Sequence, residues 1–163
     1  MTPPRVVVIA WGNPSRGDDA LGPEFLCRAE SIATHARERF EFVTDFQLQP
    51  EHATDLEGRD LALFVDASRA LADPIAFNEL EPQRDATFTT HGMSPSSVLA
   101  AFRAVFDREP PPAFQLAIAG VGFELGDPIS ETAMRNLDAA LALFTRLAGA
   151  PSAAAWRQLA QSV

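Results

Sequence analysis

Two adjacent aspartates, a third aspartate and one histidine are the residues of this sequence best suited to catalysis or metal binding. Asp18 and Asp19 end a loop that follows an apolar run, Asp66 ends a second apolar run, and His91 stands shortly before a Ser-Pro pair. Carboxylate and imidazole groups are donors that zinc, nickel, iron and manganese all accept. We therefore expect Asp19, Asp66 and His91 to form a divalent-metal site, and the donor set does not choose the metal.

The electrostatics of these groups favour a bound cation. Asp19 and Asp66, if they face each other, repel, so one of them stays protonated unless a cation lies between them. His91 is expected near the N-terminus of a helix, where the positive end of the helix dipole keeps an imidazole neutral. The neutral imidazole is the form that binds a metal.

Each of these residues also has an ordinary structural interpretation. Asp18 or Asp19 can cap the helix that follows the first loop, and Asp66 can be a turn residue at a strand end. A single histidine in a loop needs no metal. Of the other histidines, His35 is expected to be solvated on a helix, and the role of His52 stays open.

Several other chemistries are excluded by what the sequence lacks. All 13 basic residues are arginine, so a P-loop lysine and a Schiff-base lysine are impossible. No G-x-S-x-G, no H-E-x-x-H and no G-x-G-x-x-G after the first apolar run occurs. Cys27 is the only cysteine, which excludes a disulfide scaffold and leaves it as an expected helix-face residue.

The charge balance narrows the class of partner. The chain carries a formal net charge of −9, which repels phosphate backbones and suits a cation or a partner with a basic segment. The apolar run at 6–11 is too short for a signal peptide or a membrane span. We expect a cytoplasmic monomer with neither a nucleic-acid nor a membrane partner.

A parallel sheet is the element that would bring these side chains together. The runs 6–11 and 61–65 are apolar throughout, which is typical of strands buried on both faces. Further strands are expected at 41–46, 75–80 and 114–121, and helices at about 21–39, 50–57, 94–106 and 130–147. The alternation predicts one α/β domain over 1–163, with a core at about 5–147 and a loose C-terminal helix at 153–161.

In open α/β sheets, ligands bind beyond the carboxyl ends of the parallel strands. Besides the aspartates, this rule selects Asp45 and Gln47 after the second strand, Ser68 after the third and Glu124 after the last. Arg16, in the first loop, could pair with a substrate or be a solvated surface arginine.

At this point the motifs resemble a known family. The stretch from Gly12 to Gly22 is similar to the opening signature of the nickel–iron hydrogenase maturation proteases, which runs G-N, four residues, D, an acidic residue, two residues and G. The strand that ends in Asp66 and the segment 90–95 around His91 resemble the second and third metal-ligand segments. Residues 123–126 have a similar character, and 47–52 resembles the subgroup that serves soluble hydrogenases. The resemblance covers about residues 5–147 in the family's order.

The resemblance implies a three-layer α/β/α sandwich with a mostly parallel five-stranded sheet, whose single antiparallel strand we assign to 75–80. It implies an endopeptidase that removes the C-terminal extension of a hydrogenase large-subunit precursor after nickel insertion. The implied metal ligands are Asp19, Asp66 and His91, with nickel carried by the precursor and other divalent ions as substitutes. Asp19 departs from those members that have glutamate as first ligand, so either its loop must approach the metal more closely or the metal geometry must loosen.

The mechanism stays open at this stage. Asp18 is a spare carboxylate that could act as general base, and either a metal-bound hydroxide or a carboxylate-activated water could attack the scissile bond. The precursor is a transient partner, with 107–112 and 47–52 as candidate contact surfaces. The alternatives are a non-hydrolytic nickel-sensing or chaperone module and, third, a small-molecule hydrolase, which would need an enclosed pocket.

Overall fold

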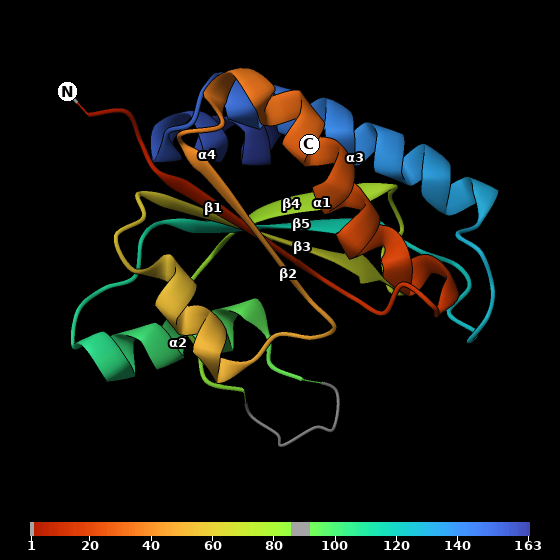
Figure 1. The fold of residues 1–163 in the computed structure, drawn as a ribbon, viewed down its shortest axis with the longest axis horizontal. Helices are drawn as coiled ribbons and strands as arrows, with labels where there is room; N and C mark the ends of the chain where they lie inside the picture. The colour runs from red at the N-terminus through yellow and green to blue at the C-terminus, as the bar shows by residue number, and fades with distance from the viewer. Residues whose placement is uncertain (1, 86–91) are drawn as a thin grey trace.

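A twisted five-stranded sheet forms the middle of the protein, as the computed structural model shows for residues 2–85 and 92–163 (Figure 1). The strand order is β2-β1-β3-β5-β4. The first four of these pair in parallel, and β4 pairs antiparallel with β5. The bounds are β1 (Val6–Trp11), β2 (Phe40–Asp45), β3 (Leu61–Ser68), β4 (Ile75–Leu80) and β5 (Ala113–Ala119). The predicted fold class and the assignment of the antiparallel strand are confirmed.

Helices cover both faces of the sheet and complete a three-layer sandwich. One face carries α1 (Leu21–Ile32), α3 (Glu131–Gly149) and α4 (Ala153–Ser162), and the other carries α2 (Pro95–Phe106) and the 3₁₀ helix η3 (Pro50–Leu56) (Figure 1). No helix in the described ranges is long and apolar enough to cross a membrane.

The core consists of two apolar layers divided by the sheet. All six residues of β1 are buried, and alternate residues contribute to opposite layers because strand side chains alternate between faces. Val8 belongs to the layer under α1 and α3, whereas Ile9 belongs to the layer under α2. This double burial explains why β1 and the first part of β3 are apolar without interruption.

The first helix and the third strand have other ends than the sequence predicts. The first helix ends at Ile32 rather than near residue 39, and a 3₁₀ turn, η2 (Ala33–Ala36), follows it. The Thr34 hydroxyl donates to the Ser31 carbonyl at 2.7 Å, and such local side-chain bonds compete with α-helical ones. β3 also continues to Ser68, so Asp66 lies within the strand rather than after it.

The C-terminal helix is firmly packed, which corrects the expectation of a loose helix at 153–161. Trp156 is fully buried, and its indole Nε1 donates to the Leu147 carbonyl at 3.0 Å. Its ring lies 5.4 Å from that of Phe114 and 6.4 Å from that of Phe77, measured between centroids. Since a buried aromatic contributes a large apolar area, Trp156 helps to anchor α4 to the sheet, as does Arg157, which pairs with Glu79 of β4.

Candidate active site

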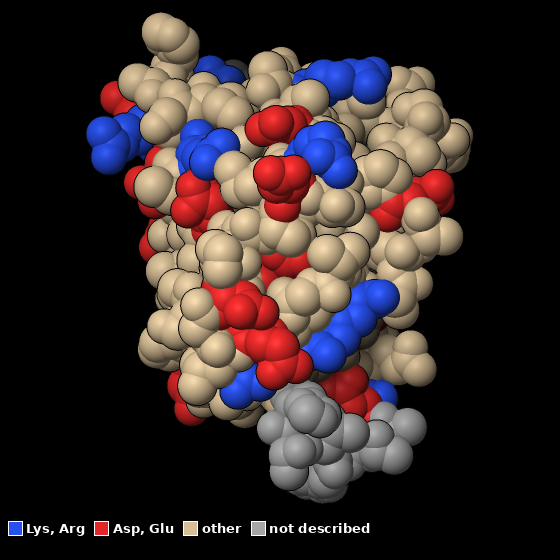
Figure 2. Space-filling view, turned by 90° about the vertical axis from the view of Figure 1, so that its right-hand side faces the viewer, with Lys and Arg blue, Asp and Glu red and all other residues tan. Residues whose placement is uncertain are grey.

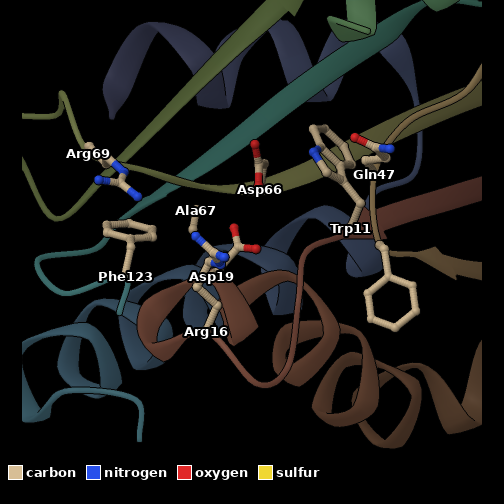
Figure 3. A pocket seen from close by; sticks show the side chains of 9 residues that line it. Trp11, Arg16, Asp19, Gln47, Asp66, Ala67, Arg69 and Phe123 are labelled. Atoms are coloured by element: carbon tan, nitrogen blue, oxygen red, sulfur yellow. The ribbon is translucent and has the colours of Figure 1, made fainter. Parts of the chain in front are cut away.

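A pocket opens at the carboxyl end of the parallel strands, where the fold rule places a site. Ala10 of β1 pairs with Val65 of β3, so Trp11 and Asp66 lie next to each other at this edge. The pocket has a volume of ≈ 540 Å³, and Figure 3 shows its lining side chains. They come from β1, from β3 and from the loops beyond the strands: Trp11, Arg16, Asp19, Phe46, Gln47, Asp66, Ala67, Arg69 and Phe123.

Asp19 reaches the pocket from the 3₁₀ turn η1 (Gly17–Ala20), which links β1 to α1. The turn is closed by the Asp19 N–H, which donates to the Arg16 carbonyl at 3.0 Å. The Asn13 N–H donates to Asp19 Oδ2 at 2.7 Å and orients the carboxylate. Asp19 therefore does not cap α1; it is held by its own loop and lines the pocket.

Asp66 lines the same pocket from β3, and its surroundings keep it partly neutral. Burial is the largest cause, and it raises the pKa of Asp66 to about 7. The nearby charge of Asp19 raises this pKa further, whereas hydrogen bonds from the Ala67 backbone and the Trp11 side chain oppose the rise. The sequence-based expectation that one of two facing carboxylates holds a proton agrees in direction, although burial rather than Asp19 dominates.

Asp18 does not face the pocket, which corrects its assignment as a catalytic general base. Its side chain is fully buried and accepts four hydrogen bonds: from the N–H groups of Val121, Gly122 and Ser130, and from the Ser130 hydroxyl, at 2.7–3.1 Å. Burial alone would raise the pKa of Asp18, but the bonds from Ser130, Val121 and Gly122 outweigh it and hold the pKa below its ordinary value. Asp18 fastens the loop after β5 and the start of α3 to η1.

His91 lies outside the described residues. Within the described ranges, no three His, Cys, Asp or Glu side chains come together as a metal-binding group. The structure thus brings together two of the three predicted ligands, Asp19 and Asp66, in one pocket. Gly92 lies against the pocket residue Gln47: a Cβ at Gly92 would be 3.2 Å from Gln47 Oε1.

The other polar residues selected from the sequence lie in different parts of the structure. Gln47 and Arg16 line the pocket, whereas Glu124 and Ser68 do not. Asp45 and His52 instead line a neighbouring pocket of ≈ 430 Å³. His52 is buried and caps η3, since its Nδ1 accepts from the Gln49 N–H at 2.8 Å, and its Nε2 lies 3.5 Å from Asp45 Oδ2.

Sequence reasoning missed Arg69 and the aromatic side chains of the pocket. The Arg69 guanidinium lies over the Phe123 ring, with Cζ 4.1 Å from the ring centroid (Figure 3). Arg69 follows Asp66 by three residues, so its place at the end of β3 was a usable signal. Its contact with Phe123, across 54 positions of sequence, could not be read from the chain.

Two carboxylates of different character in one pocket permit two kinds of chemistry. Together they can hold part of the coordination shell of a divalent cation. Without a cation, a protonated Asp66 beside an ionised carboxylate can supply and accept protons around a bound water. Figure 2 shows one face of the molecule, on which acidic and arginine side chains are interspersed.

The fold is shared with several solved structures. The chain is similar to the maturation protease HycI from Thermococcus kodakarensis, at 19% identity over 89% of this chain and 92% of that chain, with a TM-score of 0.68. It is also similar to the maturating endopeptidase HybD from E. coli, at 17% identity over 85% and 88%, with a TM-score of 0.67. A third similar structure is a hydrogenase 2 maturation peptidase from a Thaumarchaeota archaeon, at 21% identity over 89% and 98%, with a TM-score of 0.63.

This chain has the fold of the hydrogenase maturation proteases. For the Thermococcus kodakarensis structure, the shared arrangement spans 89% of this chain and 92% of that chain. Comparison of the sequence with protein-family models and with curated proteins finds no match. The resemblance read from the motifs is thus confirmed at the level of fold, and the activity has to be argued from the pocket.

Proposed function

We propose that this protein is an endopeptidase that removes the C-terminal extension of a nickel–iron hydrogenase large-subunit precursor after nickel insertion. The observation that carries the proposal is the placement of Asp19 and Asp66 in one open pocket, on the fold of solved hydrogenase maturation proteases. The pocket, of ≈ 540 Å³, is large enough to admit part of an extended chain, which is the shape of a C-terminal tail.

In this proposal, nickel arrives as part of the substrate. Asp19 and Asp66 bind it together with His91, and the scissile bond comes to lie beside them. Recognition of the metal makes cleavage depend on nickel insertion, because a precursor without nickel lacks the bonds from the metal to the protease and dissociates. The bound cation also resolves the electrostatic conflict in the pocket, since it favours the ionised form of Asp66.

Asp18 has a supporting role here rather than a chemical one. Its four hydrogen bonds leave it no free access to a water at the scissile bond. The proton acceptor is therefore Asp19 or Asp66, with polarisation of the carbonyl or of the water by the metal.

The test is mass spectrometry of a large-subunit precursor incubated with the protein, with and without nickel. We expect loss of the C-terminal extension only from the nickel-loaded precursor, and no loss with Asp19→Asn, Asp66→Asn or His91→Ala. Asp127→Asn, an exposed change in the neighbouring loop, is the matched control and should process normally. Processing at near wild-type rate by Asp19→Asn or His91→Ala contradicts the proposed site. A precursor that is bound with nickel but never cut would instead indicate a non-hydrolytic nickel-sensing or chaperone module.

A further inference from the structure

The pocket contains two arginines as well as two aspartates, and the proposed metal chemistry leaves the arginines without a role. Arg16 and Arg69 both line it. Within the described residues, neither guanidinium lies in an ion pair, although five other arginines pair with glutamates. Two positive groups thus share a small pocket with two carboxylates without neutralising them.

Arg69 is held in place by stacking rather than by a charge partner. Its guanidinium lies on the face of Phe123, at one side of the pocket, with Gln47 and Trp11 at the other side (Figure 3). Stacking on an aromatic ring occupies the face of the guanidinium and leaves the N–H groups at its edge free.

The Phe123 ring is itself fixed by the loop that Asp18 fastens. A Cβ on Gly120 would lie 2.7 Å from Phe123 Cζ and 2.8 Å from Asp18 Cβ, so the ring packs directly on the backbone there. The Asp18 N–H donates to the Gly122 carbonyl at 2.7 Å, and the carboxylate of Asp18 accepts from Val121 and Gly122. The buried hydrogen bonds of Asp18 therefore orient, through Phe123, an exposed arginine.

We propose that Arg69, stacked on Phe123, binds a carboxylate of the substrate chain, with Arg16 as the second positive group of this subsite. The planar fork of an arginine matches a carboxylate with two parallel hydrogen bonds. A carboxylate needs such a local partner, because the net charge of −9 otherwise repels acidic chains. This inference rests on the proposed function for the identity of the substrate.

The pocket then has two poles with opposite preferences. Asp19 and Asp66 favour a cation, whereas Arg16 and Arg69, which line the same pocket, favour an anion. A ligand that carries both, such as a metal-loaded chain with an acidic group nearby, satisfies all four residues together. A free metal ion or a purely basic peptide can interact favourably with the two aspartates but not with the two arginines.

The kinetic test compares Arg69→Gln with Arg146→Gln on the nickel-loaded precursor. Arg146 is exposed on α3, so its variant controls for the loss of one positive charge from the whole protein. Arg69→Gln is expected to raise KM roughly tenfold with kcat within about twofold, because a charge-assisted, bidentate pair is lost from binding and not from chemistry. Arg69→Lys should recover part of the loss, and Phe123→Leu should cause a smaller rise.

The carboxylate can come from an acidic side chain of the precursor or from the new C-terminus that cleavage creates. An increased KM for the precursor assigns it to a side chain that is present before cleavage. An unchanged KM with roughly tenfold weaker inhibition by the mature subunit assigns it to the new C-terminus. If Arg69→Gln matches Arg146→Gln in both measurements, the proposal is overturned, and the proposed protease function stands.

A binding test keeps the inference separate from proteolysis. Glutarate is titrated into the wild-type protein while the arginine Nε–H resonances are followed by NMR, with uncharged glutaramide as the matched probe. We expect a saturable shift of the Arg69 resonance with glutarate and none with glutaramide; the resonance is assigned from its disappearance in the Arg69→Gln spectrum. Equal shifts of Arg69 and Arg146 overturn the carboxylate subsite. If the precursor is never cut but glutarate binds at Arg69, the proposed function fails and the subsite survives.

Discussion

At the scale of single residues, two neighbouring aspartates of one motif perform different tasks. Asp18 and Asp19 follow each other in the chain, yet one is buried in hydrogen bonds and the other lines the pocket. The 3₁₀ turn separates them, because consecutive residues of a helical turn point in different directions. The identity of the residues was evident from the sequence, but which of the two faces a ligand depends on that turn.

Asp66→Asn is predicted to stabilise the metal-free protein at neutral pH. A carboxyl whose folded pKa is about 7, against an ordinary value of 3.8, binds more protons in the folded state between these pH values. Stability is therefore lost as pH rises from about 4 to about 7, by up to ~4 kcal/mol. Asparagine has no such titration, so the stability gain should grow over this range. Urea unfolding with a chelator at several pH values checks this; a gain that does not vary with pH contradicts it.

Asp18→Asn is predicted to destabilise the fold by ~2–4 kcal/mol at neutral pH, because an amide presents its own donors to the N–H groups that Asp18 accepts. The folded pKa of Asp18 lies below its ordinary value, so its contribution is present above about pH 4 and declines as pH falls through the lowered pKa. Urea unfolding measures both effects. Asp127→Asn, exposed in the loop that Asp18 fastens, is the control and should cost little.

At the scale of elements, the site depends on two loops that join directly through their backbones. The Gly17 N–H donates to the Asp127 carbonyl at 3.1 Å, and the Gly126 N–H donates to the Ser15 carbonyl at 2.8 Å. The loop after β1 and the loop after β5 are thus one unit, although about a hundred residues separate them. This contact helps to bring Asp19 and Phe123 to the same pocket, and no local pattern in the sequence predicts it.

Gly17→Ala is predicted to disrupt this loop pair and to lower stability by ~1–3 kcal/mol. Gly17 has a φ of +54°, and a Cβ there would lie 2.4 Å from the Gly122 carbonyl oxygen. Gly122→Ala is a matched control, because a Cβ at Gly122 meets nothing within 4 Å. Thermal unfolding of the two variants should differ clearly. If the two variants unfold at the same temperature, the close approach of the two loops is not the reason for a glycine at position 17.

The element boundaries show where sequence reasoning worked and where it could not. The Ser94 cap and Pro95 start of α2 and the limits of β4 were predicted correctly, because capping residues and prolines act locally. The predicted end of α1 was wrong by several residues, because the chain continues from Ile32 into a 3₁₀ turn, in which the Thr34 hydroxyl donates to the Ser31 carbonyl. The anchoring of α4 was also missed, because the partners of Trp156 come from β4 and β5.

At the scale of the whole molecule, apolar runs of β-branched and aromatic residues predicted a buried parallel sheet. The topology of that sheet in turn predicted the edge at which Asp19 and Asp66 meet. That much of the site was predictable, because the rule that places ligands beyond carboxyl strand ends depends only on topology. The positions of the pocket arginines were not predictable, because the Arg69 side chain is positioned by stacking on Phe123, which lies on a loop distant in sequence.

The same architecture predicts an order of local stability. β1 and β3 are central strands covered on both faces, whereas β2 and β4 are edge strands with partly exposed residues. Native-state hydrogen exchange should therefore be slowest for amides of β1 and β3 and faster for those of β2 and β4. Edge amides that exchange as slowly as those of β1 would contradict this order.

The burial of Trp156 and the pocket position of Trp11 have a practical consequence. The protein has two tryptophans and no tyrosine, so its intrinsic fluorescence arises from these two indoles. Trp11 lies beside Asp66, and Trp156 is the buried residue of the last helix. A Trp156→Phe variant would leave Trp11, in the pocket wall, as the single emitter. A spectral change on addition of a ligand would then report on that pocket without an attached dye.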